Sequence, residues 1–342
     1  MRAIRYHGPK QPLRLETLPR PTPGPGEVVV KVAASGICHT ELHFLSGLLD
    51  LGVHPLTLGH EVVGVVDEVG AGVTTPKPGD RVILYYYVGC GRCAHCVVGD
   101  ENLCDALVAE YGFVSDGGFA EYVKVPARNA VPLPASISDE AAAPIGCGVT
   151  TAVHAAGLAR LAAGDVALVY GVGAVGFGLI QLAKLSGAEV IAVSRAPAKL
   201  EKAKALGAAH ALNAKDGKVA ERVREITGGR GADVVFELVA TKETMAASTG
   251  ALAKRGRLVF IGYSEDSYTV HPIQLVITEA SVTGSVGNTL DELVRSVDLV
   301  GHEDRLTAGK FPRGQHCERD GLSRHVKPPR RIPADPSSRS WV

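Results

Sequence analysis

The sequence predicts an α/β protein with a β-rich domain followed by a doubly wound parallel sheet. A length of 342 residues suits about two domains, and 46% hydrophobic residues are ample for packed cores. The first ~150 residues read as short strands separated by turns, without long helices between them. Near residue 139 the pattern changes, and apolar strands begin to alternate with helices.

Four segments of the first half have the composition of strands. They are apolar, are bounded by turn residues, and lie at 27–34, 61–69, 79–84 and 119–125. Gly64 lies inside the second segment and predicts a bulge or bend there. Short strands of this kind favour a barrel-like or sandwich domain.

In the second half, Ser138 or Asp139 can cap a helix that runs to about Leu161. Val166–Tyr170 is continuously apolar, as a strand buried on both faces should be. Helices are then predicted at 174–186, 197–206, 219–227, 243–253 and 291–300, and strands at 190–193, 209–212, 232–236 and 257–261. This alternation is typical of a doubly wound parallel sheet.

Composition excludes several classes of partner. The net charge is zero, so neither nucleic acid nor a membrane surface is implied. The charged start lacks the apolar core of a signal peptide, and we find no run of about 18 apolar residues. We therefore expect a cytoplasmic protein.

Four of the seven cysteines stand close together, with the spacing C-x2-C-x2-C-x7-C. They are Cys90, Cys93, Cys96 and Cys104. Four thiolates can fill every position around a tetrahedral Zn²⁺, and such a closed site holds structure rather than performing chemistry. Disulfides are the alternative, but nothing marks the chain as secreted, and cytosolic clusters are more often metal sites.

A glycine-rich loop predicts a dinucleotide site. Gly171, Gly173 and Gly176 form G-x-G-x-x-G after a buried strand and at the start of a helix, which is the context the motif requires. Gly171 permits a tight turn, Gly173 lets the backbone approach a pyrophosphate, and Gly176 lets the helix pack close to the strand. The helix N-terminus then faces the phosphates.

The end of the second parallel strand favours NADP over NAD. NAD-binding chains usually place an acid there for the ribose hydroxyl, whereas this chain has Ser194 and Arg195, with Lys199 one turn further. Ser194 can donate to a 2′-phosphate, Arg195 can clamp it, and no acid repels it. The alternative is that Arg195 and Lys199 are solvated charges and that NAD, or both cofactors, are used.

Three further residues form a candidate catalytic zinc site. Cys38, His60 and Cys147 provide three ligands, and three ligands with an open position distinguish catalytic from structural zinc. Taken singly each residue is ordinary, because a free cysteine is usually a small buried hydrophobe.

With these motifs together, residues 1 to 300 resemble the zinc-dependent alcohol dehydrogenases of the medium-chain dehydrogenase/reductase family. Gly59-His60-Glu61, the four-cysteine lobe, Cys38-His39-Thr40 and the glycine loop follow the family's order. The resemblance implies a GroES-like catalytic domain at 1–145 with a lobe at 89–105. It also implies a Rossmann domain at 146–288 and a segment at 289–310 that returns toward the catalytic domain.

The resemblance also implies roles for individual residues. Cys38, His60 and Cys147 would hold the catalytic zinc, and the four lobe cysteines the structural zinc, which makes two zinc ions per subunit. Glu61 would be a nearby acid able to ligate the metal, and Glu41 would orient His60.

Other residues would serve the substrate and the cofactor. Thr40 would hydrogen-bond the substrate oxygen, and His43 would be the outer end of a proton relay. His39 would lie near the pyrophosphate and Thr151 by the nicotinamide.

The function implied is reversible hydride transfer between an alcohol and NAD(P), with aldehydes or ketones as the reverse substrates. A homo-oligomer, dimer or tetramer, is the family expectation. Two alternatives remain open, a polyol or sugar dehydrogenase of the same family and an inactive binder of zinc and nucleotide.

The last residues do not resemble the family. From Phe311 on, arginine, proline and serine crowd in, and no helical or strand period survives. We expect 311–342 to be an atypical tail that is either disordered or translated from a shifted frame. The alternative of an inactive binder assumes that this tail abolishes turnover.

Overall fold

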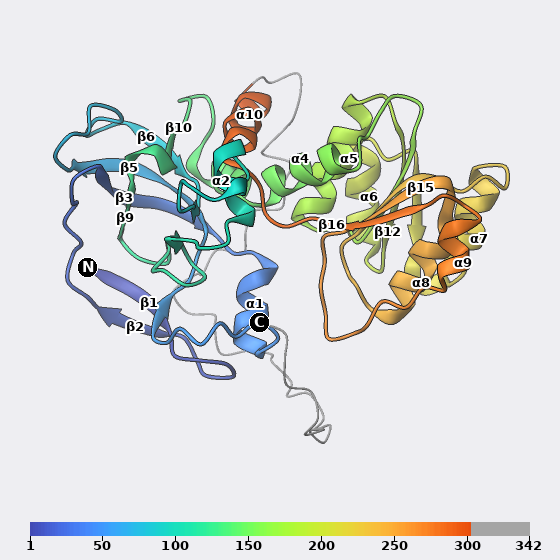
Figure 1. Cartoon of the computed structure of the whole chain (residues 1–342), viewed down its shortest axis with the longest axis horizontal. Coiled ribbons are helices and arrows are strands. Elements are labelled where there is room, and N and C mark those ends of the chain that lie inside the picture. Colours follow the sequence, from blue (N-terminus) through green and yellow to red (C-terminus); the bar gives the residue numbers. More distant parts are fainter. Residues whose placement is uncertain (302–342) are drawn as a thin grey trace.

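The computed structural model describes residues 1–301 of the chain. A group of antiparallel sheets holds the first part, and a six-stranded parallel sheet flanked by helices holds the second (Figure 1). The predicted tail 311–342 and the end of the predicted return segment, 302–310, lie outside the described residues.

The largest antiparallel sheet has the strand order β10-β6-β5-β3-β9. Its strands are β3 Glu27–Gly36, β5 Glu61–Val69, β6 Arg81–Leu84, β9 Tyr122–Pro126 and β10 Ala130–Pro132. The four predicted strands are therefore confirmed, although the last begins at Tyr122 rather than at 119. Valines from β3, β5 and β6 pack together on one face, as alternating apolar positions require.

The irregularity predicted at Gly64 lies mainly on the partner strand. Val32 stands opposite Gly64 and Ala34 opposite Val63, so β3 carries one extra residue between them. A Cβ atom on Gly64 would lie 2.2 Å from the carbonyl oxygen of Lys31. Glycine is required here because the two backbones approach so closely.

Several short elements of this half were not predicted. They are strands β1 Arg2–Tyr6, β2 Arg14–Thr17, β4 Leu56–Thr57, β7 Tyr87–Val88 and β8 Ala109–Glu110, and helices α1 His39–Ser46 and α2 Ala94–Val98. Strands β2, β1 and β4 form one small sheet, and β7 and β8 form another. Most of these elements are only two to five residues long, too short for a periodic pattern.

The parallel sheet has the order β13-β12-β11-β14-β15-β16 and every pairing in it is parallel. The strands are β11 Val166–Tyr170, β12 Glu189–Ser194, β13 His210–Asn213, β14 Ala232–Glu237, β15 Leu252–Phe260 and β16 Ser281–Gly284. The helices are α5 Ala174–Leu185, α6 Pro197–Leu206, α7 Val219–Ile226, α8 Lys242–Ala251 and the short α9 Pro272–Val276. The strand order reverses between β11 and β14, and this is where doubly wound sheets bind dinucleotides.

The single helix predicted from 138 to about 161 is wrong. The segment forms α3 Asp139–Ala142, a 3-10 turn at Ala143–Gly146, and α4 Gly148–Leu158. Ser138 caps α3 as predicted, but Cys147 leaves the helical region, with φ −133° and ψ −66°. Pro144 in the turn cannot donate an N–H, which favours the break. By length and composition alone Asp139–Leu158 could cross a membrane, yet 67% of it is buried inside the fold.

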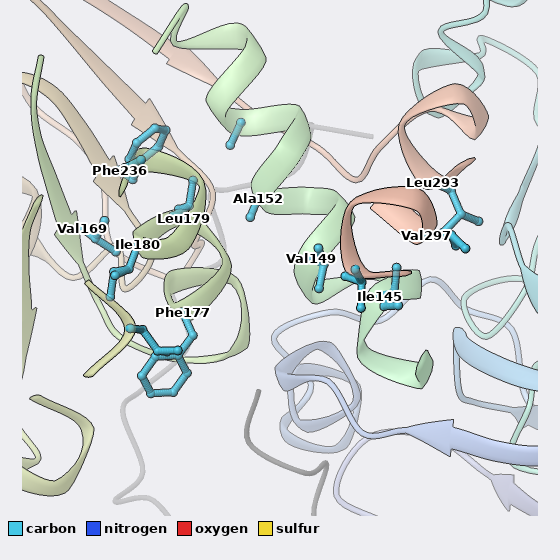
Figure 2. Packing of buried hydrophobic residues seen from close by; sticks show 14 of the residues in the cluster. Ile145, Val149, Ala152, Val169, Phe177, Leu179, Ile180, Phe236, Leu293 and Val297 are labelled. Carbon is cyan, nitrogen blue, oxygen red and sulfur yellow. The ribbon is translucent and has the colours of Figure 1, made fainter. Parts of the chain in front are cut away.

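Helix α4 lies at the centre of the main core. Figure 2 shows Val149 and Ala152 of α4 between Phe177, Leu179 and Ile180 of α5 on one side and α10 on the other. Helix α10, Leu290–Gly301, packs there through Leu293 and Val297. The core is thus continuous from the antiparallel sheets to the parallel sheet.

Candidate functional site

Two cysteines, a histidine and a glutamate converge where the two groups of sheets meet. Cys38 lies between β3 and α1, His60 and Glu61 lie at the start of β5, and Cys147 lies at the helix break. Their ligand atoms all lie within 4.8 Å of one another, and the Sγ atoms of Cys38 and Cys147 are 4.0 Å apart. The structure therefore brings together the three predicted zinc ligands, and Glu61 joins them.

This donor set fits zinc. With Zn–S bonds of about 2.3 Å, tetrahedral geometry places two ligand sulfurs about 3.8 Å apart. The observed Sγ separation of 4.0 Å lies close to that value. Two sulfurs and one imidazole are also the ligand types that zinc prefers.

Glu41 contacts two of these residues, Cys38 and His60. Its Oε2 accepts a hydrogen bond from the backbone N–H of Cys38 at 2.8 Å, and its Oε1 lies 2.9 Å from Nδ1 of His60. Glu41 and His60 are both buried. Because Nδ1 faces Glu41, Nε2 is the histidine nitrogen left for the cluster.

The acid–base groups of this cluster shift one another's pKa values. The contact with the Cys147 thiol, together with His60, lowers the pKa of Cys38, while the same contact raises the pKa of Cys147. Burial raises the pKa of Glu61, and the neighbouring Cys38 raises it further. One thiolate is thus already favoured next to a histidine, which prepares the cluster for a cation.

Thr40, His43 and His39 all lie on α1, directly after Cys38. The hydroxyl of Thr40 is 3.5 Å from Sγ of Cys38, and the His43 ring packs on the His39 ring with centroids 4.8 Å apart. Burial and the neighbouring His39 lower the pKa of His43. Thr151, one turn into α4, places its hydroxyl 3.8 Å from Sγ of Cys147.

Sequence reasoning missed Tyr263, which follows β15. Its ring contacts the His43 ring at 4.7 Å between centroids, and Thr40 lowers the pKa of its hydroxyl. The available signal was its position at the carboxyl end of a parallel strand near the point where strand order reverses. It was not recognised because the contact joins residues more than 200 positions apart.

Tyr86 and Phe113 were also missed. Both rings contact the His60 ring, with centroids 5.2 and 4.9 Å away, and they stack on each other. Glu110 lies nearby, directly opposite Tyr87 across the β7–β8 pair. Burial raises the pKa of Glu110 to about 7. The wall beside His60 is therefore largely aromatic with one acidic group.

The four lobe cysteines form the second cluster, as predicted. Their sulfur atoms all lie within 4.8 Å of one another, with Cys90 and Cys96 4.0 Å apart and Cys93 and Cys104 3.9 Å apart. These separations again suit a tetrahedral zinc ion. All six cysteines that the structure describes are free thiols, so the disulfide alternative finds no support among them.

The backbone and one glutamate arrange this lobe. N–H groups of Arg92 and Cys93 lower the pKa of the Cys90 thiol to about 6. Glu101 accepts the N–H of Gly89 at 2.9 Å and pairs with Arg128. This pair connects the lobe to the turn that follows β9. The lobe is thus prepared to bind a cation within a closed cage.

The glycine loop has the geometry that its motif predicts. A Cβ on Gly171 would lie 2.8 Å from Val239, and a Cβ on Gly176 would lie 2.4 Å from the carbonyl oxygen of Gly171. At Gly173, by contrast, an added Cβ would have open space around it. Two glycines therefore allow close packing, and the third leaves room at the N-terminus of α5 for a pyrophosphate.

Ser194 ends β12, and Arg195 and Lys199 are exposed beyond it. The Ser194 hydroxyl accepts a hydrogen bond from the N–H of Ala196 at 3.3 Å, which leaves its own proton free to donate. No acid stands at the end of β12, so nothing there opposes a 2′-phosphate.

Two domain families match the chain. Residues 24–135 match the alcohol dehydrogenase GroES-like domain, and residues 174–301 match the zinc-binding dehydrogenase family. The two matches cover the antiparallel part and the parallel part, respectively.

Named relatives extend the likeness over most of the chain. An alcohol dehydrogenase of Geobacillus stearothermophilus is 36% identical over 85% of this chain and 86% of its own. An NAD-dependent alcohol dehydrogenase of Sulfurisphaera tokodaii is 36% identical over 86% of this chain and 87% of its own. A Sinorhizobium meliloti protein, described as a zinc-binding dehydrogenase and solved with NADP, has a TM-score of 0.83, with 32% identity and 89% coverage of both chains.

Proposed function

The chain belongs to the zinc-dependent alcohol dehydrogenases of the medium-chain dehydrogenase/reductase family, and we propose that the Cys38–His60–Cys147 cluster is its catalytic centre. The reaction is reversible hydride transfer between an alcohol or carbonyl compound and a nicotinamide cofactor. The observation that carries the site assignment is the convergence of two sulfurs, an imidazole and a carboxylate within 4.8 Å. The substrates are small alcohols and the corresponding aldehydes or ketones.

The chemistry that zinc supplies when bound is polarisation of the substrate oxygen, and the nicotinamide carries the hydride. The protein's own residues handle the proton. In alcohol oxidation Thr40 hydrogen-bonds the substrate hydroxyl and passes its proton toward His43. The lowered pKa of His43 keeps its imidazole neutral near pH 7, so it can accept that proton. Glu61, whose carboxylate lies within 4.8 Å of the other ligand atoms, would be a fourth residue able to ligate the metal.

We assign the domains as follows. Residues 1–145 form the catalytic domain, with the lobe at 89–105, and residues 146–288 form the nucleotide-binding domain. The segment from 289 returns toward the catalytic domain, and the hydrogen bond that the Tyr85 hydroxyl donates to the carbonyl oxygen of Asn288 at 2.9 Å, directly before this segment, supports this. The lobe holds a second, structural zinc ion, so each subunit would carry two.

The cofactor that we favour is NADP. The support is local, namely Ser194 and Arg195 in place of an acid, with Lys199 on the same exposed side. Gly171, Gly173 and Gly176 would receive the pyrophosphate, His39 would approach it, and Thr151 would contact the nicotinamide.

A homo-oligomer, dimer or tetramer, is also part of the proposal. Among the described residues β16 pairs on one side only, with β15, so its other edge presents free backbone groups. Just before it, Ile273, Val276 and Ile277 are exposed at 56%, 74% and 67%. An apolar patch beside an open strand edge suits pairing with a second copy.

A cytoplasmic location is our proposal as well. Six free thiols in two clusters that suit metal binding are typical of a compartment that keeps cysteines reduced.

The central test is metal content and turnover of the full chain. The parent should carry two zinc ions by mass spectrometry and should oxidise members of a panel of ethanol, 2-propanol, cyclohexanol and benzyl alcohol with NAD or NADP. Cys147→Ala should lose one ion and the turnover. Its matched variant Cys93→Ser should lose the other ion and melt at lower temperature, because a closed Cys₄ site contributes folding energy.

Two results would contradict this assignment. Full turnover in Cys147→Ala would show that Cys147 is not part of the catalytic centre. A parent that binds zinc and nucleotide yet turns over none of the panel, in either direction, would favour an inactive binder.

A further inference from the structure

The residues assigned to proton handling have a partner in the other half of the molecule. Thr40 and His43 lie on α1, next to the antiparallel sheets, whereas Tyr263 follows β15 of the parallel sheet. The Tyr263 ring contacts the His43 ring at 4.7 Å, tilted by 41°. Thr40 also acts on the Tyr263 hydroxyl, because it lowers the pKa of that group, and the Thr40 hydroxyl lies 3.5 Å from Sγ of Cys38. One side chain thus touches both proposed proton-handling residues.

The backbone that carries Tyr263 is held firmly. The N–H groups of Ile261 and Gly262 both donate to the carbonyl oxygen of Glu237, at 2.9 and 3.0 Å. A Cβ on Gly262 would lie 2.4 Å from the carbonyl carbon of Leu238, so this segment lies directly against the chain leaving β14. On the far side, the Ser264 hydroxyl donates to the carbonyl oxygen of Ala240.

Glu237, whose carbonyl oxygen holds this segment, is itself fixed by hydrogen bonds. The Glu237 carboxylate is fully buried and accepts hydrogen bonds from the N–H groups of Val239 and Ala240 at 2.8 and 2.9 Å. It also accepts from the Ser248 hydroxyl of α8 at 2.7 Å. Because Glu237 fixes the ends of β14 and β15 together, Tyr263 projects from a defined point and not from a loose loop.

The chemistry of the side chain suits a positioning role. Burial raises the pKa of the Tyr263 hydroxyl, against the opposing effect of the Thr40 hydrogen bond, so this hydroxyl stays protonated near neutral pH. It can therefore both donate and accept toward Thr40. Its ring limits how far the His43 imidazole can turn.

We propose that Tyr263 is a positioning residue of the dehydrogenase, which aims the Thr40 hydroxyl through its own hydroxyl and orients His43 through its ring. This inference rests on the proposed function, because it gives Thr40 and His43 their proton-handling roles. It adds that the relay is assembled from both halves of the chain and is complete only when they are packed together.

The test separates the hydroxyl from the ring. Tyr263→Phe removes the hydroxyl alone, and Tyr263→Leu removes both. Tyr268→Phe is the matched control, since Tyr268 lines the same 340 Å³ pocket but packs on Phe260 and hydrogen-bonds Thr249. Each full-length, zinc-loaded variant is measured for benzyl alcohol oxidation, in water and in D₂O, and for the ring resonances of ¹³C-labelled histidine.

We expect Tyr263→Phe to lower kcat about two- to tenfold, the value of one hydrogen bond, with the KM for cofactor unchanged. Its solvent isotope effect should rise, because a poorly aimed hydroxyl makes proton transfer more limiting. The His43 resonance, assigned with His43→Gln, should shift in Tyr263→Leu and stay in place in Tyr263→Phe. Tyr268→Phe should match the parent in every measurement.

Two outcomes overturn the inference. One is a Phe variant with the kcat and isotope effect of the parent, and the other is a His43 resonance that does not respond to Tyr263→Leu. The resonance needs no turnover, so it tests the Tyr263–His43 contact even if the proposed function fails. Absent turnover in the parent, by contrast, refutes the function and leaves the contact measurable.

Discussion

At the scale of single residues, the Cys38–His60–Cys147 cluster is supported by a carboxylate outside it. Glu41 accepts the backbone N–H of Cys38 with one oxygen, and its other oxygen lies 2.9 Å from Nδ1 of His60, so one side chain contacts two of the proposed ligands. Residues of this kind act on a bound metal through its ligands. Their loss weakens metal binding although every ligand atom is still present.

Glu41→Gln should therefore bind zinc at this centre about 10- to 100-fold more weakly, because an uncharged amide cannot serve both partners equally. Competition with a chelator, followed by the rate of zinc release, measures this. Glu140→Gln is a suitable control, since Glu140 is exposed on α3. Equal zinc retention in the two variants would show that Glu41 does not support the site.

Our proposal on cofactor choice also concerns single positions. Ser194→Asp should lower kcat/KM with NADP about ten- to a hundredfold relative to NAD, because a charge-assisted contact to phosphate is replaced by repulsion. Ser136→Asp, which adds the same charge at an exposed loop, should leave the ratio unchanged. A parent that prefers NAD would refute the cofactor proposal outright.

At the scale of elements, the fold places chemistry where helices begin or break. Cys147 lies at the break before α4, and Cys38 lies directly before α1. Helix α10 is tied to α4 by one further pair, in which Nδ1 of His154 lies 2.9 Å from the Glu292 carboxylate. Glu292 also accepts the N–H of Thr289 at 2.8 Å and thereby caps α10.

Glu292→Gln should lower the free energy of unfolding by about 1–3 kcal/mol at pH 7. Burial alone would raise the pKa of Glu292, but hydrogen bonds from His154 and Thr289 outweigh it and lower the pKa. A carboxyl group whose pKa is lower in the folded state stabilises the fold at pH values above its unfolded pKa of about 4.3. This stabilisation is lost as the pH falls through the folded-state pKa. The difference between variant and parent should therefore shrink below about pH 4.

Urea unfolding between about pH 3 and pH 8, with the same zinc content, checks this prediction. Asp291→Asn provides the comparison, since Asp291 stands one residue earlier in α10 and is 75% exposed in a surface pair with Arg295. Its effect should stay near zero. A Glu292→Gln penalty that is constant with pH would show that the negative charge of Glu292 does not stabilise the fold.

At the scale of the whole molecule, the proposed active centre combines residues from two architectures. The antiparallel half supplies Cys38, Thr40, His43 and His60, and the parallel half supplies the nucleotide loop and Tyr263. The continuous core around α4 keeps these halves together (Figure 2). The same parallel half also exposes an apolar patch beside the open edge of β16.

If that edge pairs with a second copy, Val276→Lys should shift the protein toward monomer, because a charge would be buried in the interface. Sedimentation velocity across a concentration series measures the shift. Leu185→Lys is the control, since Leu185 is likewise the last residue of its helix and is 48% exposed. An assembly that tolerates Val276→Lys would place the interface elsewhere.

Local sequence determined the parts of this protein that depend on neighbouring residues. The continuous apolar run Val166–Tyr170, the glycines at 171 and 176 and the closely spaced lobe cysteines each form a structure within a few positions. Their period, conformational freedom or spacing therefore predicted β11, the turn before α5 and the lobe. For Cys38, His60 and Cys147, resemblance to a family supplied the grouping that spacing alone could not.

Only the tertiary structure decided what depends on distant contacts. Cys38 and Cys147 meet across 109 positions, and Tyr263 reaches Thr40 and His43 from the other half of the chain. The break at Cys147 overrode an apparently continuous helical pattern, and the two-residue strands β4, β7 and β8 exist because partners hold them. The physical reason is that such contacts are stabilised by packing between segments, which no local propensity records.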